Sequence, residues 1–432
     1  MSHRVLIVSP HFPPVNAPDH QRVRMSLPYF HEFGWEPHVL AVHPEYVQGI
    51  LDPQLTETLP LGIPITRVPA LPVLISRWIG LGSLGLRSWR SLKVEGNRLL
   101  RSGNFDLVFF STTQFPVLTL GPQWKRRWGV PYVADFQDPW WGDYHEKLGA
   151  PPPPGGRFKY ALSQFLARRA EPRVLHQASH VISVSPAYPP MWQRRYSWLK
   201  NIPITVLPFG APENDFDSGV LDKVRQEWFS KSDGKRHWVY VGRGGKDMSL
   251  AVGAFCCALQ AARKQDPQTW NRLKIHFIGT DYASDGHAVK SIAPVAADYG
   301  VADLVDEHPQ RIPYFEALAC LRDAEALIVP GSDDPGYTAS KIYPYLLAHK
   351  PLLAIFHQTS DVVRILSETG GGTVVTFGGD DSVSALAERI TTRWFQRWPP
   401  PESVVDPSAF QLFTAREMTR RLCRIFENCV SS

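Results

Sequence analysis

Two glycine-containing loops in the second half of the chain carry cationic side chains in a pattern that favours a phosphate ligand. Residues 242–246 (GRGGK) follow the apolar run 238–241, and residues 330–341 follow the apolar run 326–329 and end on Lys341. Backbone amides at such turns bind phosphate, and arginine and lysine add charged donors. The pattern predicts a diphosphate site. The alternative is that the charged residues of the first loop lie in a solvated surface turn. For Asp333 and Asp334 in the second loop, the alternative is an ordinary turn.

Polar residues in the first half point to a ligand rich in hydroxyl groups. Residues 9–24 follow the first apolar run and contain two histidines, an aspartate and two arginines, while residues 134–141 (ADFQDPWW) follow another run. Carboxylates accept hydrogen bonds from sugar hydroxyls, and indole faces pack on sugar rings. The alternatives are histidines that are mere loop residues, and a capped turn packed by the two tryptophans.

Short apolar runs alternate with helical stretches, which is typical of parallel sheets covered by helices. The predicted strands fall into two sets, at 4–9, 37–42, 106–110, 131–134, 181–184 and 204–207, and at 238–241, 275–278, 326–329, 352–355 and 374–376. The sequence therefore predicts an α/β protein with two Rossmann-like domains, residues 1–208 and 209–400, and a closing segment 401–432 with a helix at 407–429. Ligands of such sheets bind at the carboxyl ends of the strands, and two facing domains would share a cleft.

Composition narrows the class of protein. The chain has 432 residues, 44% of them hydrophobic and 20% charged, which predicts a folded protein of two or three domains. Residues 1–208 carry a charge balance of +9 and residues 209–432 one of −4, so the basic half favours an anionic membrane, nucleic acid or substrate. Five cysteines without CxxC spacing and no signal-peptide pattern indicate a cytoplasmic protein with reduced thiols and no metal site.

Two segments combine basic and aromatic residues in the manner of a membrane surface. Residues 78–101 contain five cations and two tryptophans, and residues 124–128 read WKRRW. Such segments lie well on anionic lipid. They predict peripheral contact with the inner face of the membrane and a lipid-linked or membrane-proximal acceptor. A soluble acceptor is the alternative.

The ordered segments resemble the group-1 family of retaining nucleotide-sugar glycosyltransferases, which have the GT-B fold. VLIVSPHFPP, FDLVFFSTTQFP, GVPYVADFQDPW, ASHVISVSPAY, LPFGAPENDF, WVYVGRGGK and TASKIYPYLLAHKPLLAIF occur in the family's order over about residues 4–360. The resemblance implies that Arg243 and Lys246 bind the donor diphosphate and that Asp138 lies on the acceptor side. Three departures stand out: VNAPDHQR has no glycine, Pro344 replaces a glutamate, and 111–114 lacks a histidine.

The resemblance implies a hexosyltransferase that moves a sugar from a UDP-sugar to an acceptor hydroxyl with retention, without a metal, in glycan or cell-surface polysaccharide biosynthesis. The expected catalytic residues are Asp138, His20, Arg243 and Lys246. The expected donor-binding residues are Gly242, Arg243, Lys246, Thr280, Arg311, Ile312, Asp334, Gly336, Tyr337, Thr338, Ser340 and Lys341. The expected acceptor-binding residues are Pro14, Asn16, Asp19, His20, Arg22, Gln114, Asp138 and Trp140.

Three other functions remain open on the sequence. A non-catalytic glycosyltransferase-like subunit that binds a partner enzyme or glycan would explain the missing glutamate and histidine. A nucleotide-sugar epimerase shares the two-domain arrangement but needs no acceptor. A nucleic-acid binder would use the basic half, yet no nucleic-acid motif is present and the acidic half repels phosphate backbones.

Overall fold

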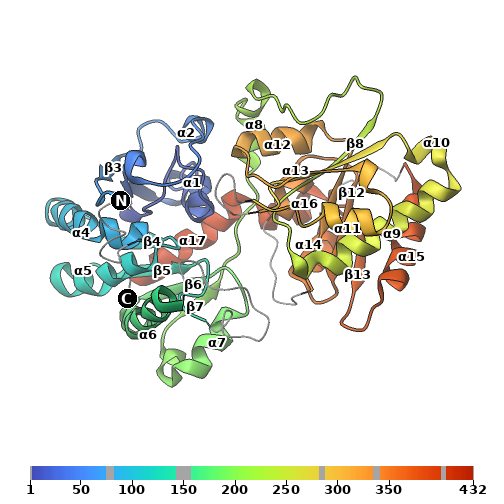
Figure 1. Ribbon diagram of the computed structural model, residues 1–432. Helices are drawn as coiled ribbons and strands as arrows, with labels where there is room; N and C mark the ends of the chain where they lie inside the picture. Colours follow the sequence, from blue (N-terminus) through green and yellow to red (C-terminus); the bar gives the residue numbers. More distant parts are fainter. Residues whose placement is uncertain are drawn as a thin grey trace. The chain divides into compact units, whose positions relative to one another are not determined.

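The computed structural model describes residues 2–73, 82–142, 157–281, 288–333, 341–399 and 405–431, with the side chains of α6 described from Tyr160 onward. The chain forms two compact units, Met1–Gly210 with Ala415–Ser432, and Ala211–Thr414. Each unit contains one sheet covered by helices (Figure 1). The second unit thus continues fourteen residues past position 400, where the sequence places the start of the closing segment, and that segment's helix lies with the first unit.

The first unit is built on a seven-stranded sheet in the order β3-β2-β1-β4-β5-β6-β7, and every pair is parallel. The strands are β1 His3–Val8, β2 Trp35–Val42, β3 Ile65–Val68, β4 Leu107–Ser111, β5 Tyr132–Phe136, β6 His180–Ser183 and β7 Ile204–Val206. The α-helices are α1 Gln21–Ser26, α2 Gln54–Glu57, α4 Leu84–Ser102, α5 Leu120–Trp128, α6 Arg157–Gln177, α7 Tyr188–Arg195 and α17 Ala415–Val430; short 3-10 turns are η1 Pro18–His20, η2 His31–Phe33, η3 Pro44–Tyr46, η4 Phe115–Thr119 and η6 Ser197–Asn201.

Side-chain alternation along β1 divides the apolar core of this unit into two layers. Leu6 and Val8 pack with α4, α5 and α7, whereas Val5 and Ile7 pack with α1 and α17. Because a parallel sheet is covered on both faces, its strands are apolar at nearly every position. That is why short continuous apolar runs predicted these strands.

The last helix, α17, is held by a stripe of apolar residues at helical spacing. Met418, Leu422 and Phe426 are all buried. The Phe426 ring lies 5.2 Å from the Trp35 ring and 5.1 Å from the Phe109 ring, centroid to centroid. The end of the chain therefore completes one face of the first sheet.

The apolar residues that suggested a membrane surface on α4 and α5 are buried or half-buried in the unit, whereas most of the cations of these two helices are exposed. Leu84, Leu92 and Trp124 are buried, and the Arg87 guanidinium donates to the carbonyls of Leu71 and Tyr46. Gly96 lets α4 approach α5, because a Cβ there would collide with the Trp124 ring. Part of the expected segment, residues 78–81, lies outside the described residues.

The second unit is built on a six-stranded parallel sheet in the order β10-β9-β8-β11-β12-β13. Its strands are β8 Arg236–Val241, β9 Leu273–Ile278, β10 Val305–His308, β11 Ala326–Pro330, β12 Leu352–His357 and β13 Thr373–Phe377. Its α-helices are α8 Glu213–Asp217, α9 Ser249–Gln265, α10 Pro267–Trp270, α11 Ala293–Asp298, α12 Tyr314–Asp323, α13 Ile342–Leu347, α14 Asp361–Thr369, α15 Val383–Arg393 and α16 Pro407–Phe410; 3-10 turns are η7 Leu221–Lys223, η8 Lys246–Met248, η9 Ala302–Leu304, η10 Phe395–Arg397 and η11 Gln411–Phe413. The two sheets confirm the predicted fold class.

A cavity of about 310 Å³ lies where the strands of the second sheet begin, between Arg236, Trp270 and Trp398. None of the predicted site residues lines it. No helix among the described residues is long and apolar enough to cross a membrane.

Candidate functional site

The GRGGK loop follows the carboxyl end of β8, as predicted, and its arginine is anchored within the loop. Arg243 Nη1 donates to Asp247 Oδ1 at 3.0 Å, and a second hydrogen bond joins Nη2 to Oδ2. Asp247 in turn accepts a hydrogen bond from the Asp333 amide through its own carbonyl, at 2.8 Å. The loop after β8 and the loop after β11 are thus joined at the carboxyl edge of the sheet, and Lys246 begins η8 with an exposed side chain.

Lys341 lies at the start of α13 and faces the same loop. A Cβ on Gly242 would come within 3.1 Å of Lys341 Nζ, so the missing side chain lets the ammonium approach the backbone. Burial, and then the charges of Arg243 and Arg311, lowers the pKa of Lys341 to about 7. Lys341 as a whole is half-buried, so solvent around its side chain moderates the shift. Three cationic side chains from three loops therefore repel one another here, and an anion would relieve that repulsion.

The other predicted donor residues fall into three groups. Arg311 and Ile312 follow β10 at the same edge. Thr280 follows β9, but its hydroxyl donates to Glu307 Oε1 at 2.6 Å, and that carboxylate also accepts the amides that begin α11. The last group, Asp334, Gly336, Tyr337, Thr338 and Ser340, lies outside the described residues.

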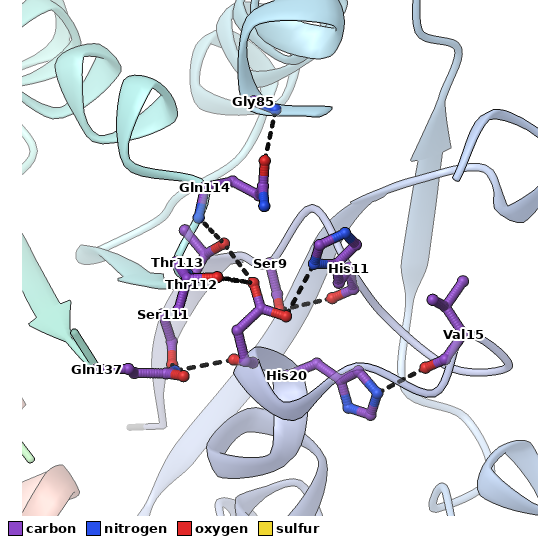
Figure 2. A network of polar contacts seen from close by, with 11 residues as sticks. Ser9, His11, Val15, His20, Gly85, Ser111, Thr112, Thr113, Gln114 and Gln137 are labelled. Carbon is purple, nitrogen blue, oxygen red and sulfur yellow. Dashed lines mark hydrogen bonds and ion pairs between the residues drawn. The ribbon is translucent and has the colours of Figure 1, made fainter. Parts of the chain in front are cut away.

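In the first unit, the buried Asp19 joins the loops after β1 and β4 through its polar contacts. Figure 2 shows its partners His11, Thr112 and Thr113. Its Oδ2 accepts hydrogen bonds from the Thr112 hydroxyl at 3.0 Å and from the Thr113 amide and hydroxyl at 3.1 Å. Its Oδ1 lies 2.9 Å from His11 Nδ1. Although burial opposes the charge, the His11 contact and these donors together lower the pKa of Asp19 to about 2.

A second buried carboxylate, Asp135 at the end of β5, holds Arg22. Both side chains are completely buried, and Arg22 Nε donates to Asp135 Oδ2 at 2.7 Å. The same guanidinium donates to the Leu207 carbonyl at 2.6 Å. The Ser111 hydroxyl also donates to Asp135, at 2.8 Å. Arg22 is therefore committed to packing within the unit, which leaves it no exposed group to offer an acceptor.

His20 is likewise fully buried, with Nε2 2.8 Å from the Val15 carbonyl. Burial, and then the charge of Arg24, lowers the pKa of His20 to about 4, so the ring is neutral at neutral pH. The side-chain Oε1 of Gln114 accepts a hydrogen bond from the Gly85 amide at 2.9 Å and so caps α4 (Figure 2). Asp19, His20, Arg22 and Gln114 thus share one role in the described structure, which is to hold loops in place.

Besides Gln114, which is half-buried, four predicted acceptor residues keep solvent contact. Pro14 and Asn16 are half-buried in the loop after β1. Asp138 follows β5 and is exposed; desolvation, and then the Asp19 carboxylate, raises its pKa to about 6, with water moderating the shift. The Trp140 ring stacks on Phe115 at 5.6 Å. Asp138 beside an indole is the arrangement that suits a hydroxyl-rich ligand.

Several residues that shape these sites were missed by the sequence analysis. Asp247 stands four residues after Arg243, a spacing that could have indicated the pair. Glu307, Thr112 and Gln137 gave no local signal, because their partners come from other strands. Among the described residues no cluster of three histidine, cysteine, aspartate or glutamate side chains could hold a metal ion.

Two parallel sheets, each covered by helices, define an α/β protein of two Rossmann-like units, and a cationic glycine loop lies at the carboxyl edge of the second sheet. The family model of the glycosyl transferase 4-like domain matches residues 20–210, which is most of the first unit. No curated protein matches the sequence.

Solved structures match the whole chain. Sucrose-phosphate synthase from Thermosynechococcus elongatus is 14% identical, with 98% of each chain covered and a TM-score of 0.59. HepE from Anabaena, in complex with UDP and glucose, is 15% identical, with 98% of each chain covered and a TM-score of 0.57. A UDP-forming trehalose-phosphate synthase from Burkholderia xenovorans, in complex with glucose-6-phosphate, is 11% identical over 98% of this chain and 100% of its own, with a TM-score of 0.60.

The chain therefore has the GT-B fold, and residues 20–210 match the model of the glycosyl transferase 4-like domain. This confirms the resemblance to the group-1 family that the ordered motifs indicated.

Proposed function

We propose that this chain transfers a hexosyl group from a UDP-sugar to an acceptor hydroxyl with retention of configuration. The observation that carries the proposal is the cluster of Arg243, Arg311 and Lys341 at the carboxyl edge of the second sheet, in which burial, and then the two neighbouring positive charges, lowers the pKa of Lys341 to about 7. A nucleoside diphosphate is an anion of the size and charge that such a cluster favours. The UDP bound by HepE supports UDP as the nucleotide.

The chemistry asked of these side chains is charge stabilisation. The bond between the sugar carbon and the diphosphate breaks, the acceptor oxygen bonds to that carbon on the same face, and its proton goes to the departing phosphate oxygen. Arg243, Lys246 and Lys341 would stabilise the negative charge that develops on the diphosphate. With that charge met by side chains, the proposed reaction needs neither a protein nucleophile nor a metal ion.

Asp138 and Trp140 are the residues proposed to orient the acceptor. Asp138 keeps solvent contact, and since its pKa, although raised to about 6, still lies below 7, it is mostly a carboxylate at neutral pH and can accept a hydroxyl hydrogen bond. We propose a glycan or lipid-linked acceptor in cell-surface polysaccharide biosynthesis. His20 has no part in this step, because it is buried.

The test compares two arginines of the second unit that are both paired with aspartate. Arg243 pairs with Asp247 at the cationic cluster. Arg263, on α9, pairs with Asp303 and is not one of the cluster residues. Calorimetry with UDP, GDP, ADP and dTDP should find one nucleotide family, most tightly UDP. Arg243→Ala should weaken UDP binding about 10- to 100-fold, a loss of about 1.4–2.8 kcal/mol, and Arg263→Ala should not change it.

Two results would redirect the proposal. If no nucleotide binds the wild-type chain, or if Arg243→Ala binds UDP like the wild type, the donor site is wrong. If UDP-sugar binds but is neither hydrolysed nor transferred to any acceptor, the non-catalytic subunit replaces the transferase; the buried His20 and the proline at position 344 favour that second candidate.

A further inference from the structure

One helix of the first unit, α6, has apolar side chains on both of its faces. Ala167, Glu171, Val174 and Leu175 are buried and hold the helix on the unit. Leu162, Phe165 and Leu166, by contrast, are 45%, 49% and 48% exposed.

The exposed side chains form a stripe opposite the buried face. At 100° a residue, Leu162, Phe165, Leu166, Arg169 and Arg173 fall within an arc of about 100°, and the centre of the buried set lies roughly 165° from Leu162. The stripe therefore points away from the core, and repacking within the unit would not cover it. Spacing of i, i+3 and i+4 places the three apolar side chains against one another.

A contiguous apolar stripe differs from the single exposed apolar residues that any protein carries. Elsewhere in the described structure, large exposed apolar side chains occur singly. Val94 on α4 is an example on a helix, and Leu412 is an example in a short turn. Exposing three large apolar side chains together is unfavourable in water, so the stripe fits a surface that is covered during function.

Positive charge continues the stripe toward the carboxyl end of α6. The Arg169 guanidinium lies over the Phe165 ring, 4.3 Å from its centroid, and Arg173 is exposed one turn further along. Arg168 stands beside them and is also exposed. The acidic residue of the described part of this helix, Glu171, is buried on the opposite face. Apolar side chains followed by arginines match the order of acyl chains and phosphate headgroups in a bilayer.

We propose that α6 docks on an anionic membrane, with Leu162, Phe165 and Leu166 inserted among the lipids and Arg169 and Arg173 on the headgroup phosphates. Residues 1–208 carry a charge balance of +9, which favours an anionic membrane as the partner of this stripe. The same basic unit of a second copy would repel it. The inference moves the membrane contact from α4 and α5, whose apolar residues are packed, to α6. It rests on the proposed function in one respect: docking on the membrane would bring the enzyme to the lipid-linked acceptor proposed above.

The test is flotation of the full chain with vesicles of phosphatidylcholine alone and with about 30 mol% phosphatidylglycerol, at about 0.1 M and 0.5 M NaCl. Wild-type protein should float with the anionic vesicles, and less so at high salt. The triple substitution Leu162→Ser, Phe165→Ser and Leu166→Ser should lower the partition coefficient by at least about tenfold. The control Val94→Ser removes an even more exposed apolar residue, from α4, and should not change flotation.

Further measurements separate this inference from the proposed function and from rival occupants. UDP affinity should be equal in the wild type and the triple variant, because the proposed UDP site lies in the second unit. Thermal unfolding of the triple variant should match that of the wild type, which shows that its first unit is folded. The docking proposal is overturned if the wild type ignores anionic vesicles, or if the triple variant floats like it. It is also overturned if sedimentation shows a dimer that the triple variant loses, because a second copy then covers the stripe.

Discussion

Replacing Asp19 with asparagine should destabilise the first unit in a way that depends on pH. The carboxylate accepts three hydrogen bonds from residues 112 and 113 and contacts His11, all in a buried site. Asparagine keeps the shape but brings two N–H donors and no charge, so donors that now face an anion lose part of their attraction. Because these bonds join the loops after β1 and β4, the loss should fall on the first unit alone.

The pKa of Asp19 sets the size of the effect. A fall from 3.8 to about 2 corresponds to about 2 kcal/mol of stability that the ionised carboxyl gains in the folded state. Since the folded pKa lies below the unfolded one, this stability is fully present above about pH 5 and is lost as the pH falls through 4 toward 2. At about pH 3 roughly half of it should remain.

The assay is calorimetric unfolding of both proteins at about pH 7 and pH 3. For a domain of 150–250 residues, a loss of about 2 kcal/mol lowers Tm by roughly 4–8 °C. The gap between the wild type and Asp19→Asn should therefore shrink by about half at the lower pH. Asp303→Asn, which removes an exposed carboxylate from the second unit, should shift Tm little at either pH. Equal Tm values at pH 7, or a gap that stays constant with pH, would refute the reasoning.

Three further predictions follow from buried or crowded groups. Arg22→Met should cost about 3–5 kcal/mol because it leaves Asp135 charged and buried, and Arg22→Met with Asp135→Leu should recover part of that in denaturant unfolding. UDP should bind more tightly at pH 6 than at pH 8 because Lys341 is charged below its pKa of about 7, and Lys341→Met should bind UDP more weakly and lose most of this dependence in calorimetry. Gly96→Ala should cost about 1–3 kcal/mol in thermal unfolding, because its Cβ meets the Trp124 ring; a wild-type Tm would contradict that contact.

Most of the fold could be predicted from the sequence because a buried parallel strand is apolar at almost every position. Runs such as 238–241 and 352–355 lie within β8 and β12. The edge strands β3 and β10 were missed, since half-exposed strands such as Val305–His308 mix charged and apolar residues and give no continuous run. The sequence also gives no local signal that residues 401–414 belong to the second unit. Their placement depends on distant contacts, such as the hydrogen bond from the Asp406 amide to the Thr369 carbonyl.

The candidate site could be predicted only in part. The sequence shows which polar residues a loop contains, but not which of them already form hydrogen bonds or ion pairs inside the protein. Arg243 and Lys341 come together, as the rule for strand carboxyl ends predicts. Arg22 and His20 follow a strand just as those residues do, yet they are buried. Nothing local distinguishes them, since their partners, Asp135 and the Val15 carbonyl, are contributed by the folded surroundings.

The direction of a pKa shift separates these two kinds of polar residue. Asp19 has a lowered pKa because neighbours already stabilise its charged form, so the group has little left to gain from a ligand. Lys341 also has a lowered pKa, but for a base this means that burial and two neighbouring cations make its charged form unfavourable. An anion bound there would restore that charge, and the free energy released would add to its affinity. By this argument the polar groups at the carboxyl edge of the first sheet are already satisfied, whereas Lys341 at the edge of the second would gain from an anion such as the diphosphate proposed above.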